Sequence, residues 1–221
     1  MIPQRISRRQ MLGMALGANT LALAGSWSPV RAETLKQTPN QILGPFYPLD
    51  KPPAEIADLV ILPGRPGRAQ GQVLHVMGRL LNVDAKPIAG ARVELWQANT
   101  WGRYRHPSDR NSAPLDPNFD GFAVQVTDAE GRYHFKTIKP AGYPTGPNSM
   151  RPPHIHFEVT GRMDRLVTQM YFAGDPLNDK DPFLQSAGAG KERLVVKLQP
   201  PSSSFEPDSL LAVWDIVVYR G

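Results

Sequence analysis

The sequence predicts an all-β fold, a sandwich of two sheets with Greek-key-like connections, long functional loops and an extended N-terminal arm. Short runs rich in β-branched and aromatic residues occur along the chain, separated by turn sequences such as DAKPIAG, DAEGR and KPAGYP. No long amphipathic helix is evident between them. The chain has no cysteine, so neither disulfides nor thiolate ligands contribute to this fold.

Residues 1–32 have the features of a twin-arginine export signal. Arg8 and Arg9 precede an uncharged, mostly apolar stretch, and the segment ends in PVRA, with small residues where a signal peptidase cleaves. The apolar stretch is too short and too rich in glycine and alanine for a membrane span. We therefore expect a periplasmic or secreted protein with no membrane segment in its mature form.

The predicted signal also carries most of the net charge of the chain. Without its four arginines, 21 of the 25 basic residues remain against 20 acidic residues, a net charge of +1. A nearly neutral chain lacks the electrostatic footprint of a nucleic-acid-binding protein, so no nucleic-acid partner is expected. The remaining length is enough for one domain with a sizeable core.

Residues 33–70 form the predicted arm, and residues 71–221 form the predicted β-sandwich core. The arm is rich in proline and glycine, shows no periodic pattern, and contains GPFYP at 44–48. Strands are predicted at 72–82, 91–98, 122–128, 131–138, 153–159, 165–173, 192–198 and 210–220. The polar, proline-rich stretch 99–121 is predicted to be a loop, and structureless loops of this length are usually functional or disordered.

Two of the five histidines have the spacing of metal ligands. His154 and His156 lie one residue apart in the strand-like run RPPHIHFEV, so their side chains share one face of the strand. His75 and His134 occur singly in strand runs, which favours a structural role, and His106 lies in the long loop. An H-x-H pair alone is a weak signal, so its meaning depends on what else could complete a site.

Three further residues could complete a site with this pair. Glu158 continues the histidine face, and a His–His–Glu set would suit a zinc hydrolase, although no nucleophile motif accompanies it. Tyr104 and Tyr143 lie in glycine- and proline-rich loops, where core packing explains them poorly. A strongly Lewis-acidic cation can lower the pKa of a phenol from about 10 and so ligate it. Two phenolates with two imidazoles would favour ferric iron over zinc, because anionic oxygens stabilise the higher charge.

Four longer motifs occur in order along the mature chain: VELWQANTWGRYRH, APLDPNF, TDAEGRYHFKTIKPAGYP and RPPHIHF. Together they resemble the intradiol ring-cleavage dioxygenases, and most of all the protocatechuate 3,4-dioxygenase subunits. The likeness runs from GPFYP to near the C-terminus. It implies a non-haem Fe(III) oxidoreductase that incorporates both atoms of O2 into a small aromatic diol, protocatechuate-like. The ring would open between the two hydroxylated carbons to give a cis,cis-muconate type diacid.

The resemblance also implies roles for individual residues. The implied iron ligands are Tyr104, Tyr143, His154 and His156. Of these, Tyr143 and His156 would be axial, and Tyr143 would accept a proton from the substrate. Arg151 matches the active-site arginine of the family, which would stabilise charge on the ring, and Gln169 matches a glutamine near the site. Glu158 has no ligand role in the family.

The chain departs from the family in two respects. Iron-carrying subunits usually have an aromatic residue shortly after the GYP tyrosine, where this chain has Thr145 and Gly146, so the pocket wall differs. The well-known enzymes pair two related subunits, one of which contributes pocket residues to the other. Here one chain must either form a homo-oligomer, which we expect, or do without that contribution. A second class remains open, because AKPIAGARVELW followed by TDAEGRYHF also resembles metal-free, exported transthyretin-like binding modules. That alternative leaves the loop tyrosines and RPPHIHF unexplained.

Overall fold

The computed structural model describes residues 34–51 and 55–220. The predicted export signal, 1–32, therefore lies outside the described residues. In the described part of the predicted arm no helix or strand forms, apart from isolated bridges such as Ile56 to Val124. None of the helices in the described ranges is long and apolar enough to span a membrane.

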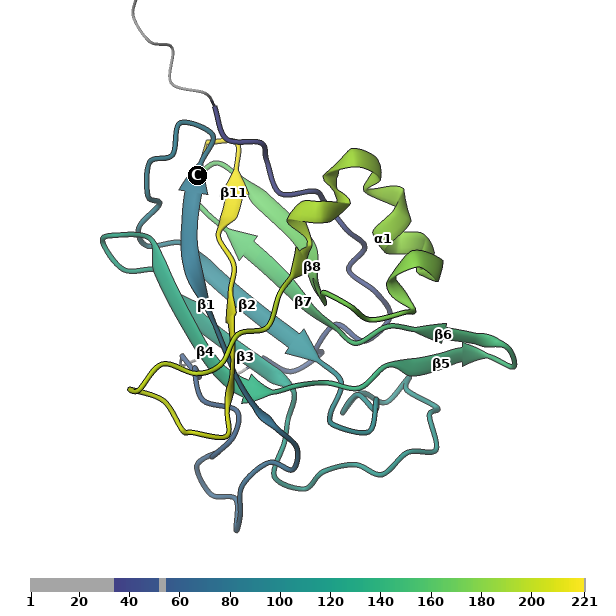
Figure 1. Ribbon diagram of the computed structural model, residues 1–221. Helices are drawn as coiled ribbons and strands as arrows, with labels where there is room; N and C mark the ends of the chain where they lie inside the picture. The colour runs from purple at the N-terminus through teal and green to yellow at the C-terminus, as the bar shows by residue number, and fades with distance from the viewer. Residues whose placement is uncertain (1–33, 52–54, 221) are drawn as a thin grey trace, which may run out of the picture. The chain divides into compact units, whose positions relative to one another are not determined.

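The described residues form strands in three sheets with very little helix, so the predicted all-β class is confirmed (Figure 1). The first sheet contains β1 (Val73–Asn82), β4 (Arg132–Ile138), β10 (Leu210–Val213) and β11 (Ile216–Val218). The second has the order β3 (Phe122–Val126), β2 (Arg92–Gln97), β7 (His154–Thr160), β8 (Arg165–Phe172), β9 (Val195–Val196). The third is a hairpin of β5 (Tyr143–Gly146) and β6 (Ser149–Arg151). The one α-helix of the described residues is α1 (Pro182–Ser186).

The two larger sheets enclose one apolar core. Phe157 of β7 has its ring centroid 6.5 Å from that of Phe135 on β4 and 5.1 Å from that of Trp214, so side chains of both sheets meet. Ile155 and Val159 enter the same core, as strand alternation requires. The histidines of β7 therefore lie on the opposite face of this sheet.

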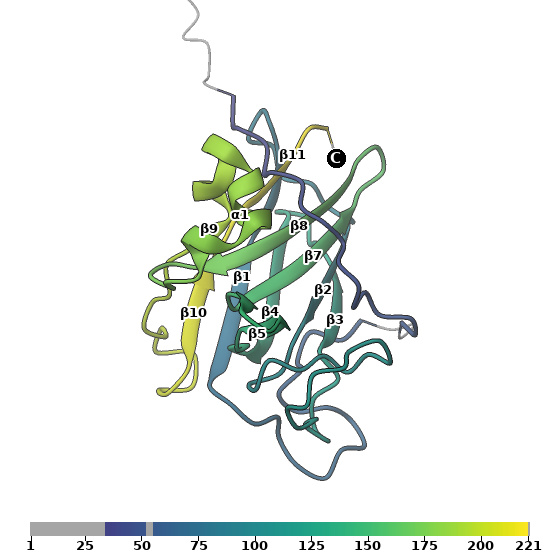
Figure 2. The ribbon, with the colours of Figure 1, turned by 90° about the vertical axis from the view of Figure 1, so that its right-hand side faces the viewer.

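The arm covers that opposite face. Gln169, which pairs with His156 and so shares its face, donates a hydrogen bond from Nε2 to the carbonyl oxygen of Ile42 at 3.0 Å. The backbone N–H of Gln41 donates to the carbonyl oxygen of Val167 in β8 at 2.8 Å. Figure 2 shows the arm running across β8 and β7. Because the arm covers this face, side chains on both faces of β7 are buried.

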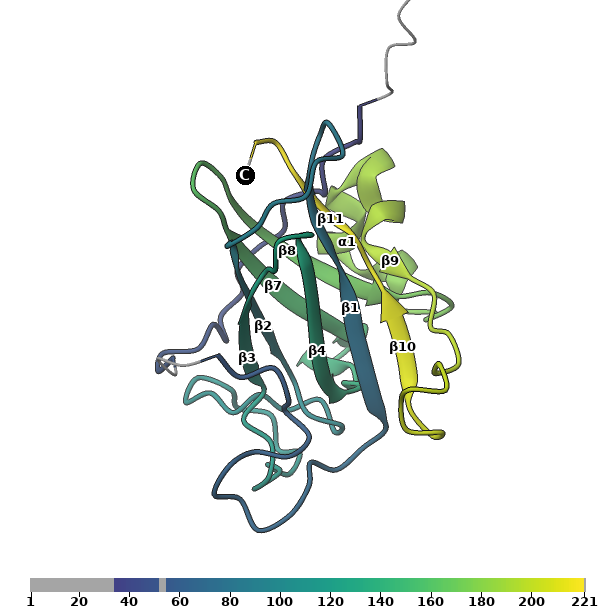
Figure 3. The ribbon, with the colours of Figure 1, turned by 90° about the vertical axis from the view of Figure 1, so that its left-hand side faces the viewer.

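Two predicted strands form differently in the structure. Of residues 192–198, only Val195–Val196 pair as a strand, because the chain before them winds into the 3-10 helix Gly188–Arg193. Residues 210–220 divide into β10 and β11, which pair with successive parts of β1 (Figure 3). The break falls at Trp214, whose carbonyl oxygen would lie 1.9 Å from a Cβ at position 78, so only Gly78 permits this close crossing.

Candidate metal centre

The four predicted metal ligands come together around the first residues of β7. Tyr104 lies in the loop after β2, Tyr143 begins β5, and His154 and His156 belong to β7. All four side chains are buried, with exposed fractions between 2% and 7%. Segments far apart in the sequence thus supply one cluster.

The rings of these four residues converge. The Tyr104 hydroxyl lies 3.5 Å from Nε2 of His154. Ring centroids are 5.5 Å apart for Tyr104 and Tyr143, 5.6 Å for Tyr143 and His154, and 4.9 Å for His154 and His156. Two phenols and two imidazoles therefore face a common small volume.

His154 is held in the protonation state that a metal ligand needs. Its Nδ1 lies 2.7 Å from the carbonyl oxygen of Pro152, and since a carbonyl can only accept, Nδ1 carries the hydrogen. Burial and the nearby charge of Arg151 lower the His154 pKa to about 3, so the ring is neutral. The lone pair on Nε2 is therefore directed toward Tyr104 and Arg151, and the hydrogen bond from Nδ1 orients the ring.

His156 makes no hydrogen bond with any described residue, and its Nδ1 is buried without a partner. The ring is held by packing, because it stacks on Trp96 with centroids 4.8 Å apart and planes at 14°. Burial keeps its pKa well below the usual range, so it is neutral. Gly44 of the arm, at φ +79°, approaches the ring so closely that a Cβ there would lie 3.1 Å from His156 Cε1. An unsatisfied buried imidazole is the kind of group that a metal ion satisfies.

The two phenols are neutral without a cation. Burial raises the pKa of Tyr104 well above its usual range, and it also raises the pKa of Tyr143, against the opposing charge of Arg151. A bound cation would reverse this by stabilising the phenolates. In the described ranges no group of three His, Cys, Asp or Glu side chains could hold a metal, so a metal centre here depends on the tyrosines. The donor set fits a hard, Lewis-acidic cation.

Glu158 is engaged elsewhere. Its carboxylate accepts hydrogen bonds from Nε of Arg165 at 2.7 Å and from the hydroxyl of Tyr47 at 2.7 Å. Tyr47 belongs to GPFYP and also contacts Glu94, which pairs with Glu158 across β2 and β7. These contacts anchor the arm, and they give the His–His–Glu zinc set no support.

Arg151 is buried beside the ligand cluster. Its Nε donates to Asp181 at 2.8 Å, and its Nη2 donates to Gln169 Oε1 at 2.9 Å and to the hydroxyl of Tyr171 at 2.8 Å. Its Nη1 lies 3.0 Å from Nε2 of His154. Gln169 is completely buried, and its amide is occupied at both ends, by Arg151 and by the arm carbonyl described above.

Sequence reasoning missed Asp181 and Tyr171. Asp181 caps α1 by accepting from the backbone N–H of Leu184, and Asp-Pro before a short apolar run is a helix-start signal. That signal indicates a cap but not a partner 30 residues away. Tyr171 pairs with His154 across β7 and β8, so strand register could have indicated it.

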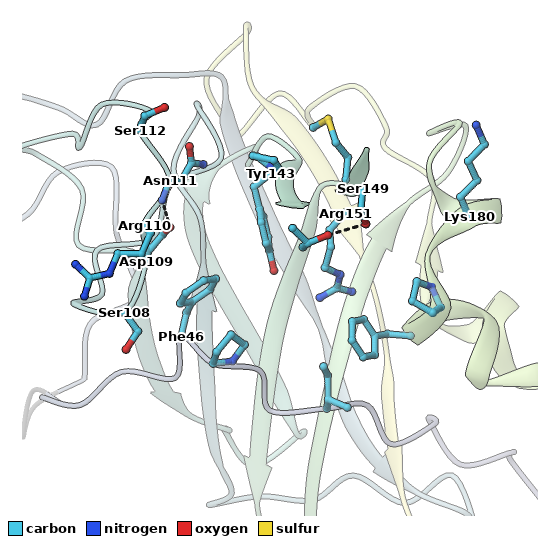
Figure 4. A pocket seen from close by; sticks show the side chains of 17 residues that line it. Phe46, Ser108, Asp109, Arg110, Asn111, Ser112, Tyr143, Ser149, Arg151 and Lys180 are labelled. Carbon is cyan, nitrogen blue, oxygen red and sulfur yellow. Dashed lines mark hydrogen bonds between the residues drawn. The ribbon is translucent and has the colours of Figure 1, made fainter. Parts of the chain in front are cut away.

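A cavity of about 810 Å³ opens beside the cluster. It is lined by Ile42, Pro45 and Phe46, residues 108–112 of the long loop, residues 143–145 and 149–151 of the hairpin, and Lys180, Pro182 and Phe183. Tyr143 and Arg151 lie between the long loop and the segment at Lys180 (Figure 4). Of the predicted site residues only these two line the cavity. Thr145 also lines it, and no aromatic side chain occupies that position.

Comparison with known proteins agrees with this geometry. Residues 42–220 match the family model described as Dioxygenase. The chain is 47% identical over 157 residues to the protocatechuate 3,4-dioxygenase beta chain of Burkholderia cepacia, covering 69% of this chain and 66% of that protein. It is 34% identical over 151 residues to the hydroxyquinol 1,2-dioxygenase of Rhizobium sp. (strain MTP-10005), covering 62% of this chain and 48% of that protein. The chain therefore spans about half to two thirds of the length of these relatives.

Solved structures show the same similarity. The dioxygenase domain of a dioxygenase carbohydrate-binding fusion from Streptomyces sp. SirexAA-E matches with a TM-score of 0.63 and 26% identity. That match covers 84% of this chain and 100% of the solved chain.

Proposed function

Because the chain belongs to the intradiol ring-cleavage dioxygenase family, we propose that it uses O2 to cleave a small aromatic diol between its two hydroxylated carbons. The product would be a cis,cis-muconate type diacid. The observation that carries the proposal is the convergence of two buried phenols and two neutral imidazoles beside a cavity. A metal-free transthyretin-like module has no need of such a cluster.

The proposed cofactor is non-haem Fe(III), held by Tyr104, Tyr143, His154 and His156. Two anionic phenolate oxygens favour the ferric over the ferrous state. When bound, the ferric ion supplies a Lewis acid that draws electron density from the diol and prepares its ring for O2.

The remaining chemistry belongs to side chains of the chain itself. Tyr143 lines the cavity, so its phenolate oxygen can accept a proton from an incoming diol hydroxyl. Arg151, which also lines the cavity, stabilises negative charge that builds on the ring. Phe46 packs over Tyr104 and Tyr143, at centroid distances of 4.7 and 6.0 Å, and shields both phenols from water.

The cavity lining favours a diol with an anionic substituent. Arg110 and Lys180 line it on opposite sides, and neither forms an ion pair with another described residue (Figure 4). Two unpaired cations would attract a carboxylate on the ring. We therefore infer a protocatechuate-like substrate.

Two further parts of the proposal concern assembly and location. The relative from Burkholderia cepacia is a beta chain, which supports a multi-subunit assembly, and we infer that this chain forms a homo-oligomer. The twin-arginine pattern in residues 1–32 supports export to the periplasm or beyond.

The decisive test is the visible absorption of the purified protein, before and after anaerobic addition of protocatechuate or catechol. We expect a tyrosinate-to-iron charge-transfer band that shifts when the diol binds, followed by ring cleavage when air is admitted. A protein that stays colourless after ferric reconstitution would refute the ligand assignment. The transthyretin-like module would then become the leading account.

A further inference from the structure

Asp181 is a completely buried carboxylate with no part in the proposed ligand set or cavity lining. Its Oδ2 accepts from Nε of Arg151 at 2.8 Å, and its Oδ1 lies 3.3 Å from Nη2 of the same guanidinium. Oδ1 also accepts from the backbone N–H of Leu184 at 2.8 Å. The carboxylate thus joins the guanidinium of Arg151, through both of its oxygens, to the first turn of α1.

The donors of Arg151 are divided between two edges of the guanidinium. The Nε–Nη2 edge is occupied by Asp181, Gln169 and Tyr171. Nη1 has one partner among the described residues, Nε2 of His154 at 3.0 Å. Since Nη1 carries two hydrogens, one edge is held by the protein while the other faces the ligand cluster.

Arg151 needs this support because of its surroundings. In the described part of the chain its only carboxylate partner is Asp181, and a buried guanidinium without a counter-charge is costly. A cation bound at the neighbouring tyrosines and histidines would also repel it. Phe183, two residues beyond Asp181, stacks on the guanidinium at 4.6 Å and lines the cavity. The segment 181–183 therefore supplies both the counter-charge of the guanidinium and the ring that covers it.

We propose that Asp181 is a positioning residue for ring cleavage, which clamps the Nε–Nη2 edge of Arg151 so that Nη1 is presented to the reacting diol. The inference rests on the proposed function, in which Arg151 stabilises charge on the ring. Without the clamp the guanidinium would turn away or withdraw from the cation. Charge stabilisation would then be lost, while binding of the diol would change little.

The test is Asp181→Asn in the full chain. Asparagine caps a helix as well as aspartate does, so α1 keeps its first turn, but the amide has no charge and offers a single acceptor oxygen. We expect kcat to fall by about 10²-fold, as for other misplaced catalytic groups. KM should stay within about twofold of wild type, because ground-state binding is intact. The ferric charge-transfer band should be unchanged.

A second readout needs neither iron nor turnover. In the metal-free protein, the Nε–H of Arg151 should give a 1H–15N signal that exchanges slowly with water, and Asp181→Asn should make that exchange fast. Asp179→Asn is the matched control, since it makes the same chemical change at an exposed residue of the same segment. It should leave both kcat and the Nε–H signal unchanged. A protein without any ring cleavage would refute the proposed function, and the clamp would still be tested by this signal.

Three results would overturn the inference. The first is wild-type kcat in Asp181→Asn, and the second is a fall in kcat while Nε–H exchange stays slow. The third is loss of the ferric band together with activity, which would indicate a merely structural role. If Asp181→Asn does not fold, Tyr171→Phe takes its place, because it removes one acceptor from the same edge. It should lower kcat by roughly two- to tenfold, the cost of one hydrogen bond, and wild-type kcat there would overturn the inference.

Discussion

The molecule contains two histidine pairs that differ in how many of their ring nitrogens have hydrogen-bond partners. His154 and His156 lie on β7, whereas His75 and His134 lie on the neighbouring strands β1 and β4. In the second pair, His75 Nδ1 lies 2.9 Å from His134 Nε2, and His75 Nε2 lies 2.8 Å from a carboxylate oxygen of Glu206. Both nitrogens of His75 therefore have partners. On β7, by contrast, His156 has no hydrogen-bond partner among the described residues.

The hydrogen-bond directions of the second pair leave it no lone pair for a metal at His75. A carboxylate can only accept, so His75 Nε2 carries the hydrogen and Nδ1 accepts from His134 Nε2–H. Phe205 stacks on His75 with centroids 4.0 Å apart, and Lys136 pairs with Glu206. The chain of bonds fastens the 199–209 loop to the sheet. A histidine pair is thus a candidate metal site only where its partners leave nitrogens free to face other donors.

The largest expected effect is a loss of iron binding and activity, and it is found by substituting one histidine of each pair in turn. His154→Ala removes a predicted ligand, so we expect loss of the ferric band and a fall in kcat/KM of at least about 10²-fold. His75→Gln should keep both, because His75 is neither a predicted ligand nor part of the cavity lining. Visible absorption, iron content and steady-state kinetics measure this. Equal iron content in the two variants would contradict the conclusion that only the pair on β7 contributes metal ligands.

The second pair should matter for stability instead. His75→Ala leaves His134 without its side-chain partner, takes one of two partners from Glu206 and removes a buried ring, so the free energy of unfolding should fall by about 1–3 kcal/mol. Urea unfolding measures this, with His106→Ala in the long loop as a comparison. A His75→Ala protein as stable as wild type would mean that the 199–209 loop is fastened by other contacts.

A smaller effect concerns the cavity, which only the pair on β7 adjoins. Lys180→Met and Arg110→Met remove unpaired charges from the lining, so KM for protocatechuate should rise by roughly two- to fivefold each, as for exposed ion pairs. KM for catechol, which has no carboxylate, should not change. Equal changes for the two diols would refute the inferred anionic substrate.

The smallest effect is a pH dependence at His134. Burial, followed by the electrostatic effect of His75, lowers the pKa of His134 from its ordinary value of 6.5, although Asp58 and Glu206 oppose the shift. Below that value the unfolded chain takes up a proton that the folded chain refuses, so stability is full above about pH 6.5 and falls as the pH drops toward the folded pKa. Glu206, whose pKa is lowered to about 2 chiefly by Lys136, remains ionised in this window. We therefore expect the free energy of unfolding to change less between a pH above 6.5 and a pH below 6.5 in His134→Gln than in wild type.

Some of the site follows from local rules and some does not. The alternation of β7 places both its histidines on one face, and the motif order points to the family, so the four ligand candidates could be proposed from the sequence alone. The all-β class could also be predicted, because strand and turn patterns depend on residues that are close in the sequence. The β5–β6 hairpin was missed. The division of 210–220 was missed too, because Gly78 permits a crossing with Trp214 that no local pattern encodes.

By itself, the sequence determined which residue types lie on which face of each strand, because side-chain direction depends only on neighbours in the chain. Only the tertiary structure decided which nitrogens and oxygens find partners. Asp181 lies 30 residues from Arg151 in the sequence, yet it holds the Arg151 guanidinium in place. Glu206 lies 131 residues from His75, yet it occupies one ring nitrogen of His75. Nδ1 of His156, by contrast, has no partner in the described part of the chain. The physical reason is that hydrogen-bond satisfaction is a property of the folded environment, and a side chain's chemistry depends on which of its polar atoms that environment leaves free.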